Sequence, residues 1–293
     1  MGFRPIEKFA SITPVAASAK ASADLPAAGT YYSIELHCLD AGAAVSVANI
    51  TADILNVKIT LDGTTVWEAS AAAIYKLYEH HFAKHDGADP IPGVLPIILA
   101  PDYLTQTSEA NIIAYGMANV GVMQLEVTFN SAITVDQIDV YVERQSGAAG
   151  NRPLGTHKRL LTLVRDFGSS GVQEITDLPI ASGNGSIVTA AYHFLYDGSA
   201  AVINSIEVLA NNATVMNLVP DISQQILEKK GRKFMVAGAA NDLYSVCFDL
   251  SNDLTGYLNN KDLNDLRFKV DWSAAPGSYR LLRESYYGVG QNN

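Results

Sequence analysis

Six histidines are the side chains of this sequence best suited to metal binding, and three of them gather in one short stretch. His81 and His85 stand four residues apart, the spacing that places two ligands on one face of a helix. The metalloprotease motif His-Glu-x-x-His also needs a glutamate after its first histidine, but here Phe82 follows His81. We therefore interpret His80, His81 and His85 as part of a solvated helix face.

Two further histidines, His37 and His193, occupy equivalent positions in two predicted strands. A cupin metal site needs His-x-His with a glutamate and another histidine nearby, and neither half of the chain has His-x-His. We interpret both as satisfied or edge histidines. Asp62-Gly63 and the acidic stretch 86–89 can offer oxygen ligands to calcium, but the EF-hand spacing is missing and turn chemistry accounts for both.

Basic residues cluster at 157–159, at Arg165 and at 229–233. Lysines before Gly231 are ordinary at the end of a helix, where cations favour the helix dipole. A contact of these cations with an acidic neighbour or a lipid headgroup stays open. The sequence has no phosphate loop, Gly-x-Ser-x-Gly elbow, Cys-x-x-Cys pair or nucleophile triad. We predict no catalytic, cofactor-binding or metal residues, no cofactor and no enzymatic activity.

The composition describes a globular, acidic chain. Of 293 residues, 48% are hydrophobic and 17% charged, which is enough apolar material for a large core. A formal net charge of −10 argues against binding to duplex nucleic acid, which usually needs a basic face. Cys38 and Cys247 lie in apolar runs and are predicted to be buried free thiols, as suits a reducing cytoplasm. No signal-peptide pattern and no membrane-length apolar run is evident.

A short hairpin motif occurs twice. Residues 57–68 carry β-branched residues on both sides of Asp62-Gly63, the strongest short-range hairpin signal, and Trp67 is expected to be buried on the same sheet as Ile59. Residues 206–217 align with them position for position at an offset of 149, with Asn211-Asn212 at the turn. Asparagine also tolerates positive φ, so both segments are predicted to be hairpins.

Other segments repeat in the same order, at offsets that drift as loops change length. They are 24–26 with 177–179, and 125–129 with 268–272. A helical pattern also follows each hairpin, over 69–84 and over 222–230. These repeated segments indicate an internal duplication. We predict a first domain at 1–148, a linker at 149–160 and a second domain at 161–293.

Each half holds about eight short strands separated by Gly and Pro turns, a density typical of a sandwich or barrel. An eight-stranded two-sheet sandwich is a jelly roll. We therefore predict an all-β fold of two tandem eight-stranded jelly-roll β-sandwiches, with a short helix inserted in each. Within the first half, 122–129 and 137–143 are predicted to pair as a long hairpin, and 40–52 to form a loop.

A family resemblance follows from these motifs. Leu25-Pro26 leading to Gly29-Thr30-Tyr31, then residues 34–36, then 56–63 and a helix, resembles the first jelly roll of double jelly-roll major capsid proteins. The likeness is to the corticovirus type of the tectivirus–adenovirus lineage. Because the second half repeats the first, the likeness extends across nearly the whole chain. The second turn, Asn211-Asn212, departs from the Asp-Gly of the first.

The resemblance implies a structural protein. In this family homotrimers present six similar lobes and tile as pseudo-hexagonal capsomers of an icosahedral virion, usually over an internal membrane. The expected partners are the other copies of the homotrimer, neighbouring capsomers, minor capsid or penton proteins and an internal viral membrane, with no specific nucleic acid. The expected location is the virion capsid of a bacteriophage or other virus, after synthesis in the host cytoplasm.

Two other functions stay open on the sequence. A tandem β-sandwich that binds carbohydrate, or a spike protein, would use solvent-exposed aromatic residues, and Tyr31, Tyr32, Tyr286 and Tyr287 are the candidates. A bicupin-like metalloenzyme would use the paired histidines.

Overall fold

A computed structural model describes residues 4–82, 90–100, 112–147, 150–180, 187–197, 202–237, 241–250, 257–260 and 263–288. By its internal contacts the chain forms two units, Met1–Tyr78 with Gly87–Leu161, and Glu79–Asp86 with Thr162–Asn293. The strand β11 (His157–Phe167) begins inside the predicted linker. The prediction of a linker at 149–160 between two domains remains untested.

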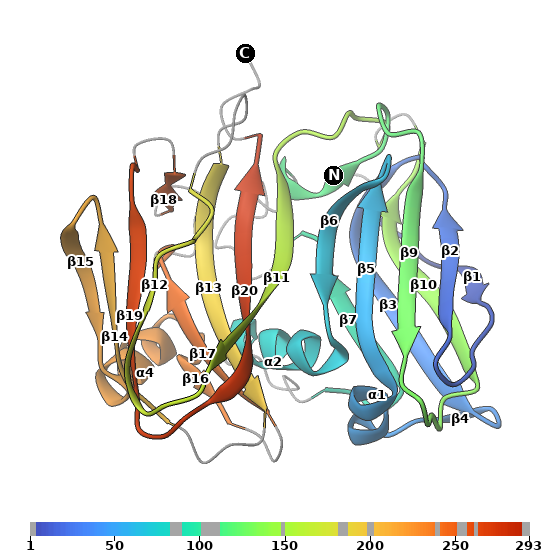
Figure 1. Cartoon of the computed structure of the whole chain (residues 1–293). Coiled ribbons are helices and arrows are strands. Elements are labelled where there is room, and N and C mark those ends of the chain that lie inside the picture. Colours follow the sequence, from blue (N-terminus) through green and yellow to red (C-terminus); the bar gives the residue numbers. More distant parts are fainter. Residues whose placement is uncertain are drawn as a thin grey trace. The chain divides into compact units, whose positions relative to one another are not determined.

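The first unit contains two antiparallel sheets of four main strands each (Figure 1). One sheet has the order β1 (Ile6–Ile12), β10 (Gln137–Gln145), β3 (Thr30–Asp40) and β7 (Val94–Ile98), with the short β4 (Ala43–Ala44) and β8 (Tyr115–Gly116) also on β3. The other has the order β6 (Thr64–Ala69), β5 (Ile54–Leu61), β9 (Met123–Phe129) and β2 (Lys20–Leu25). Some neighbours in sequence, such as β1 and β2, lie in different sheets, as in a jelly roll.

The predicted hairpin of 122–129 and 137–143 is wrong. Both segments are strands, β9 and β10, but β9 pairs with β5 and β2 whereas β10 pairs with β1 and β3. Alternation reveals that a segment is a strand, but it carries no information about which strand lies beside it. The connection between them crosses from one sheet to the other.

The predicted loop at 40–52 is also partly wrong, because it contains the helix α1 (Val47–Asp53), whose first turn is capped by the side chain of Ser46. The buried carboxylate of Asp53 ends this helix and accepts the backbone N–H groups of Thr134 and Val135 at 2.7 and 2.9 Å. The end of α1 therefore fixes the crossing between β9 and β10.

The second unit repeats the arrangement. One sheet has β11 beside β20 (Gly277–Tyr287), then β13 (Ile187–Asp197), β17 (Asn241–Cys247) and the short β16 (Met235–Val236), with β18 (Leu258–Asn259) on β13. The other has the order β12 (Gly171–Ile175), β19 (Leu266–Trp272), β14 (Ile203–Ala210) and β15 (Ala213–Leu218). The order β1-β10-β3-β7 matches β11-β20-β13-β17, and β2-β9-β5-β6 matches β12-β19-β14-β15. The predicted tandem jelly rolls are confirmed.

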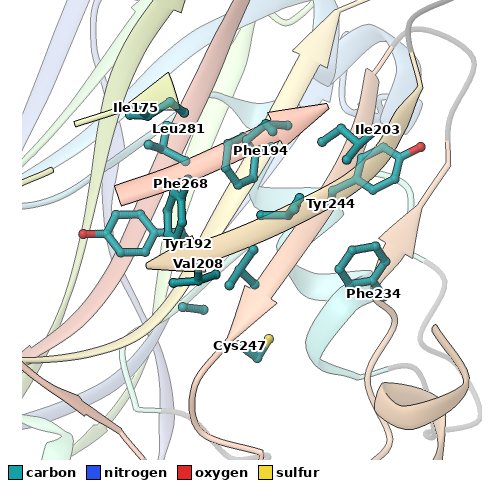
Figure 2. Packing of buried hydrophobic residues seen from close by; sticks show 14 of the residues in the cluster. Ile175, Tyr192, Phe194, Ile203, Val208, Phe234, Tyr244, Cys247, Phe268 and Leu281 are labelled. Atoms are coloured by element: carbon teal, nitrogen blue, oxygen red, sulfur yellow. The ribbon is translucent and has the colours of Figure 1, made fainter. Parts of the chain in front are cut away.

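Aromatic rings fill the core of the second unit. Figure 2 shows Phe194 and Tyr192 of β13 beside Phe268 of β19, with ring centroids of Phe268 at 5.8 Å and 5.0 Å from theirs. All three side chains are buried, and such ring pairs add stability beyond the apolar area they bury.

A helix follows each hairpin, as predicted. The first, α2 (Ala71–His81), starts in a run of alanines, the strongest helix formers. The second, α4 (Pro220–Lys229), has proline at its first position, and Gly231 beyond its end adopts φ 87°. Within the described residues, no helix has the length and apolar character needed to cross a membrane.

The two hairpin turns share one conformation. Asp62 and Gly63 have φ of 47° and 80°, and Asn211 and Asn212 have φ of 50° and 63°. Positive φ at both central residues is the tight turn that matches the twist of paired strands. Aspartate, asparagine and glycine tolerate it better than other residues, which explains why the sequence is restricted at both turns.

The first residue of each turn also holds the loop that leads into a central strand. Asp62 Oδ1 accepts the backbone N–H groups of Gly121 and Val122 at 2.9 and 2.8 Å, and Asp62 N–H donates to the Val122 carbonyl. These contacts hold the chain at the start of β9.

Asn211 does the same in the second unit. Its Oδ1 accepts the backbone N–H groups of Asn264 and Asp265, and its own N–H donates to the Asp265 carbonyl at the start of β19. Aspartate and asparagine therefore have the same role in the two jelly rolls.

This equivalence predicts a difference between two substitutions of Asp62. Asp62→Ala removes two hydrogen bonds at a left-handed residue and should cost about 1–3 kcal/mol in the free energy of unfolding. Asp62→Asn keeps an acceptor oxygen, as Asn211 does, and should stay within about 1 kcal/mol of the original protein. Urea unfolding measures both, and an equal cost for the two variants would show that the side-chain acceptor is unimportant.

The hairpin also yields a prediction for the core. Trp67 lies directly across from Ile59 and is 3% exposed, as expected from the sequence. Trp67→Ala should cost about 3–5 kcal/mol, because the cavity cannot close completely. Met216 occupies the equivalent position of β15 but is only half-buried, so Met216→Ala should cost clearly less. Thermal or urea unfolding compares them, and similar losses would contradict this explanation.

Candidate functional site

The histidines at the end of α2 are buried, so their interpretation as a solvated helix face is wrong for His80 and His81. His80 is 0% and His81 is 7% exposed, and both belong to the second unit. Helical spacing showed that they are neighbours, but not that strands distant in sequence cover them. His85 and the acidic stretch 86–89 lie outside the described residues.

These histidines contact the face of β13 that points away from the aromatic core. Tyr192 and Phe194 belong to that core, so the alternation of the strand directs His193 to the opposite face. Ser245 of β17 lies directly across from His193 on one side, and Leu282 of β20 lies across on the other. Glu284, two residues after Leu282, shares this face.

The carboxylate of Glu284 lies between two imidazoles. Its Oε2 is 3.0 Å from His81 Nε2 and 3.5 Å from His193 Nε2. His193 Nδ1 is 2.8 Å from Ser245 Oγ. His193 is 0% and Glu284 is 1% exposed, so this polar group is shielded from water. We refer to His81, His193 and Glu284 as the histidine–glutamate cluster.

His80 lies next to this cluster as a neutral side chain. Its Nδ1 contacts the Lys233 carbonyl, which can only accept, so Nδ1 carries the proton. His80 Nε2 is then the acceptor for the Cys247 thiol, whose Sγ is 3.6 Å away. Burial, with His81, His193 and Arg232 nearby, holds the pKa of His80 well below its usual value. Burial also raises the pKa of Cys247 to about 12, so this thiol is not a nucleophile near neutral pH.

A buried ion pair completes the surroundings. Arg232 donates to both carboxylate oxygens of Asp249, at 2.7 and 2.9 Å. Both side chains are 2% exposed, and burial raises the pKa of Asp249. A paired, bidentate arrangement is the form in which such charges are tolerated inside a protein.

Comparison with known proteins places the chain in a family. The family model for the viral coat protein P2 N-terminal domain matches residues 6–145, and that for the viral coat protein P2 C-terminal domain matches residues 158–289. The chain belongs to the viral coat protein P2 family. It is a viral major capsid protein, which confirms the resemblance inferred from the sequence. No curated protein matches the sequence of this coat protein.

Solved capsid proteins share its fold. The major capsid protein P2 of bacteriophage PM2 is 20% identical with a TM-score of 0.79, and the match covers 97% of each chain. A protein in the atomic structure of Sulfolobus turreted icosahedral virus is 10% identical with a TM-score of 0.67, over 97% of this chain and 91% of that one. The capsid of the virus PBCV-1 gives 10% identity and a TM-score of 0.67, over 98% and 94%.

The expectation that four tyrosines are exposed for carbohydrate binding is wrong. In this coat protein Tyr31, Tyr32 and Tyr286 are at most 3% exposed. Tyr287 is half-buried, and its hydroxyl accepts a hydrogen bond from Arg283 at 2.6 Å. Because three of the four rings are inside the protein, the observation that motivated the carbohydrate alternative is lost.

The other residues singled out in the sequence lie in strands and contact neighbouring side chains. His37 is half-buried on β3, with β10 and β7 on its two sides, and its ring makes an edge-to-face contact with Tyr141. His157 and Lys158 are buried in β11, so they do not form an exposed basic linker. Arg165 pairs with Asp177 at 2.7 Å.

One signal in the sequence pointed to the buried cluster. The stretch 187–196 is almost continuously apolar, a pattern typical of a strand covered on both faces. His193 lies inside this stretch and is therefore expected to be buried. Its partners His81 and Glu284 are 112 and 91 residues away in sequence, and no local pattern links them to it.

His157 of this coat protein predicts a pH dependence. Its Nδ1–H donates to the Gly155 carbonyl at 2.9 Å, and its Nε2 accepts from Arg159 Nε at 3.1 Å, with the ring of Tyr115 edge-on nearby. Protonation would place two donors face to face. Burial and Arg159 lower the pKa of His157 to about 4, from 6.5.

Because unfolded His157 takes up a proton below pH 6.5 and folded His157 does so only near pH 4, stability should fall as the pH drops between these values. The loss from this residue should reach at most about 3 kcal/mol. His157→Gln should flatten this slope in urea unfolding measured from pH 7 to 4. His37→Gln is the matched control and should keep the slope. An unchanged slope in His157→Gln would contradict the assignment.

Proposed function

We propose that this coat protein assembles as a homotrimer and forms pseudo-hexagonal capsomers of an icosahedral virion. The observation that carries the proposal is the repeated strand order of the two units. Two similar jelly rolls in one chain become six similar lobes in a trimer. Two units that differ in sequence suit a heterologous contact, in which the second unit of one chain meets the first unit of the next and the ring closes.

Among the described strands, the second unit has a sheet edge at β15 that suits this contact. In the first unit β6 has a second neighbour besides β5, because Leu160, in the part of β11 that belongs to this unit, pairs in parallel with Trp67. The equivalent strand β15 ends its sheet among the described strands. Open strand edges are commonly covered by another element or chain. We assign the edge of β15 to a second copy of the coat protein.

Apolar side chains near this edge support the same contact. Ile222 and Ile226, one turn apart on α4, are 60% and 44% exposed, and Val215 of β15 is 50% exposed. Grouped exposed apolar residues mark interaction surfaces more often than scattered ones do. Burial of these side chains by a neighbouring copy would contribute to trimer stability.

Further partners follow from shell geometry. Hexagonal tiles alone cannot close an icosahedral shell, so we include neighbouring capsomers and a minor capsid or penton protein at the vertices. An internal viral membrane and synthesis in the host cytoplasm belong to the same proposal. Two free, buried cysteines suit a reducing compartment. The division into 1–148, 149–160 and 161–293 also remains a proposal.

The trimer is tested by size-exclusion chromatography with light scattering on the purified coat protein. We expect a stable homotrimer, and a double change of Ile222→Asp and Ile226→Asp should shift it toward monomer. Val172, 62% exposed on β12 at the opposite edge of the same sheet, supplies the control Val172→Asp, which should remain trimeric. Only monomer from the unchanged protein at high concentration would contradict the proposed assembly.

A further inference from the structure

We propose that the histidine–glutamate cluster, His81, His193 and Glu284, is a buried zinc-binding site. All three residues belong to the second unit, and each is at most 7% exposed. The proposal does not depend on capsomer assembly, because the site lies within one chain.

The distances between the donor atoms fit one ion. Tetrahedral zinc, with nitrogen and oxygen ligands at about 2.0–2.1 Å, holds its ligand atoms about 3.3 Å apart. Glu284 Oε2 is 3.0 Å from His81 Nε2 and 3.5 Å from His193 Nε2, and all three atoms lie within 4.8 Å of one another. Small side-chain shifts are enough to bring them around a single ion.

His193 is oriented as a metal ligand should be. Its Nδ1 is 2.8 Å from Ser245 Oγ, which can accept a hydrogen bond from Nδ1–H, and in that tautomer the lone pair of Nε2 is free to bind a cation beside Glu284. A hydrogen bond from the second ring nitrogen is the usual way in which a ligating imidazole is held. His193 is 0% exposed, and its Nε2 has no hydrogen-bond partner among the described residues. A buried polar atom of this kind is costly unless something binds it.

An ion pair without metal accounts for only part of the cluster. A protonated His81 beside Glu284 explains the 3.0 Å contact between them. It does not give His193 Nε2 a hydrogen bond, whereas a cation bound to all three residues would bind this atom directly.

The donor set favours zinc over calcium or magnesium. Two imidazole nitrogens and one carboxylate oxygen are common zinc ligands, whereas calcium and magnesium prefer oxygen ligands. The Glu284 carboxylate partly neutralises the positive charge of the ion. The guanidinium of Arg232 is held by both oxygens of Asp249, which offsets its repulsion of a cation nearby.

A cavity lies beside the cluster. A pocket of about 210 Å³ is lined mainly by apolar side chains from β15, α4 and β17, and Ser245 and Cys247 form part of its wall. Ser245 contacts His193, and Cys247 contacts His80 beside the cluster. The cavity is therefore separated from the cluster by the side chains of Ser245 and Cys247.

The test is zinc binding to the folded coat protein after dialysis against a chelator, measured by competition with a chromophoric zinc chelator. We expect one zinc per chain, and a loss of affinity of at least about 100-fold in His193→Gln and in Glu284→Gln. His37→Gln is the matched control, since His37 occupies the equivalent position of β3, and it should bind like the unchanged protein. No stoichiometric zinc in the unchanged protein would overturn the proposal, as would undiminished binding by folded His193→Gln.

A second measurement covers the case in which the buried variants fail to fold. Cobalt(II) added to the unchanged, metal-free protein should give the visible d–d bands of a four-coordinate site, and zinc should displace it. Zinc should also raise Tm, on the order of 5–10 °C at 100 times Kd. Absence of these bands together with an unchanged Tm would overturn the proposal without any variant.

Discussion

Each jelly roll depends on the way in which a two-residue turn holds the start of a central strand. The side chain of Asp62 or Asn211 accepts two backbone N–H groups from the loop before β9 or β19, and its backbone N–H donates back. The strand that follows lies between two others in its sheet. A slip of one residue would turn its apolar side chains away from the core, so the contact fixes the register of the whole sheet.

The two units kept this framework while their outer sheet faces diverged. His37 and His193 occupy equivalent strand positions, but His37 is half-buried against Tyr141 whereas His193 is fully buried under the end of α2. Once that face was covered, polar side chains on it needed partners, because an unpartnered polar group is costly inside a protein. Ser245 and Glu284 are the polar side chains next to His193 on this face.

A coat protein needs stable lobes and extended contacts, and the second unit combines both. Its core is dense in aromatic rings, while α4 and β15 carry exposed apolar side chains. The titratable groups inside it are held in neutral or paired forms: Cys247 as a thiol, His80 as an imidazole and Arg232 with Asp249. Burial therefore keeps Cys247 protonated near neutral pH, and Arg232 and Asp249 satisfy each other's charge inside the lobe.

Sequence patterns alone indicated most of the strands, the two turns, the helix after each hairpin and the duplication, because each depends on local periodicity or on residues that tolerate positive φ. They also identified Trp67 and both cysteines as buried. They did not determine that β9 and β10 lie in opposite sheets, since alternation is the same for any partner.

These patterns also did not determine that His80 and His81 are buried against β13, β17 and β20. These points became visible in the folded protein, because sheet partners and the residues that cover a helix face are set by contacts between residues far apart in sequence. The meeting of His81, His193 and Glu284 has the same origin, and no spacing within the sequence records it.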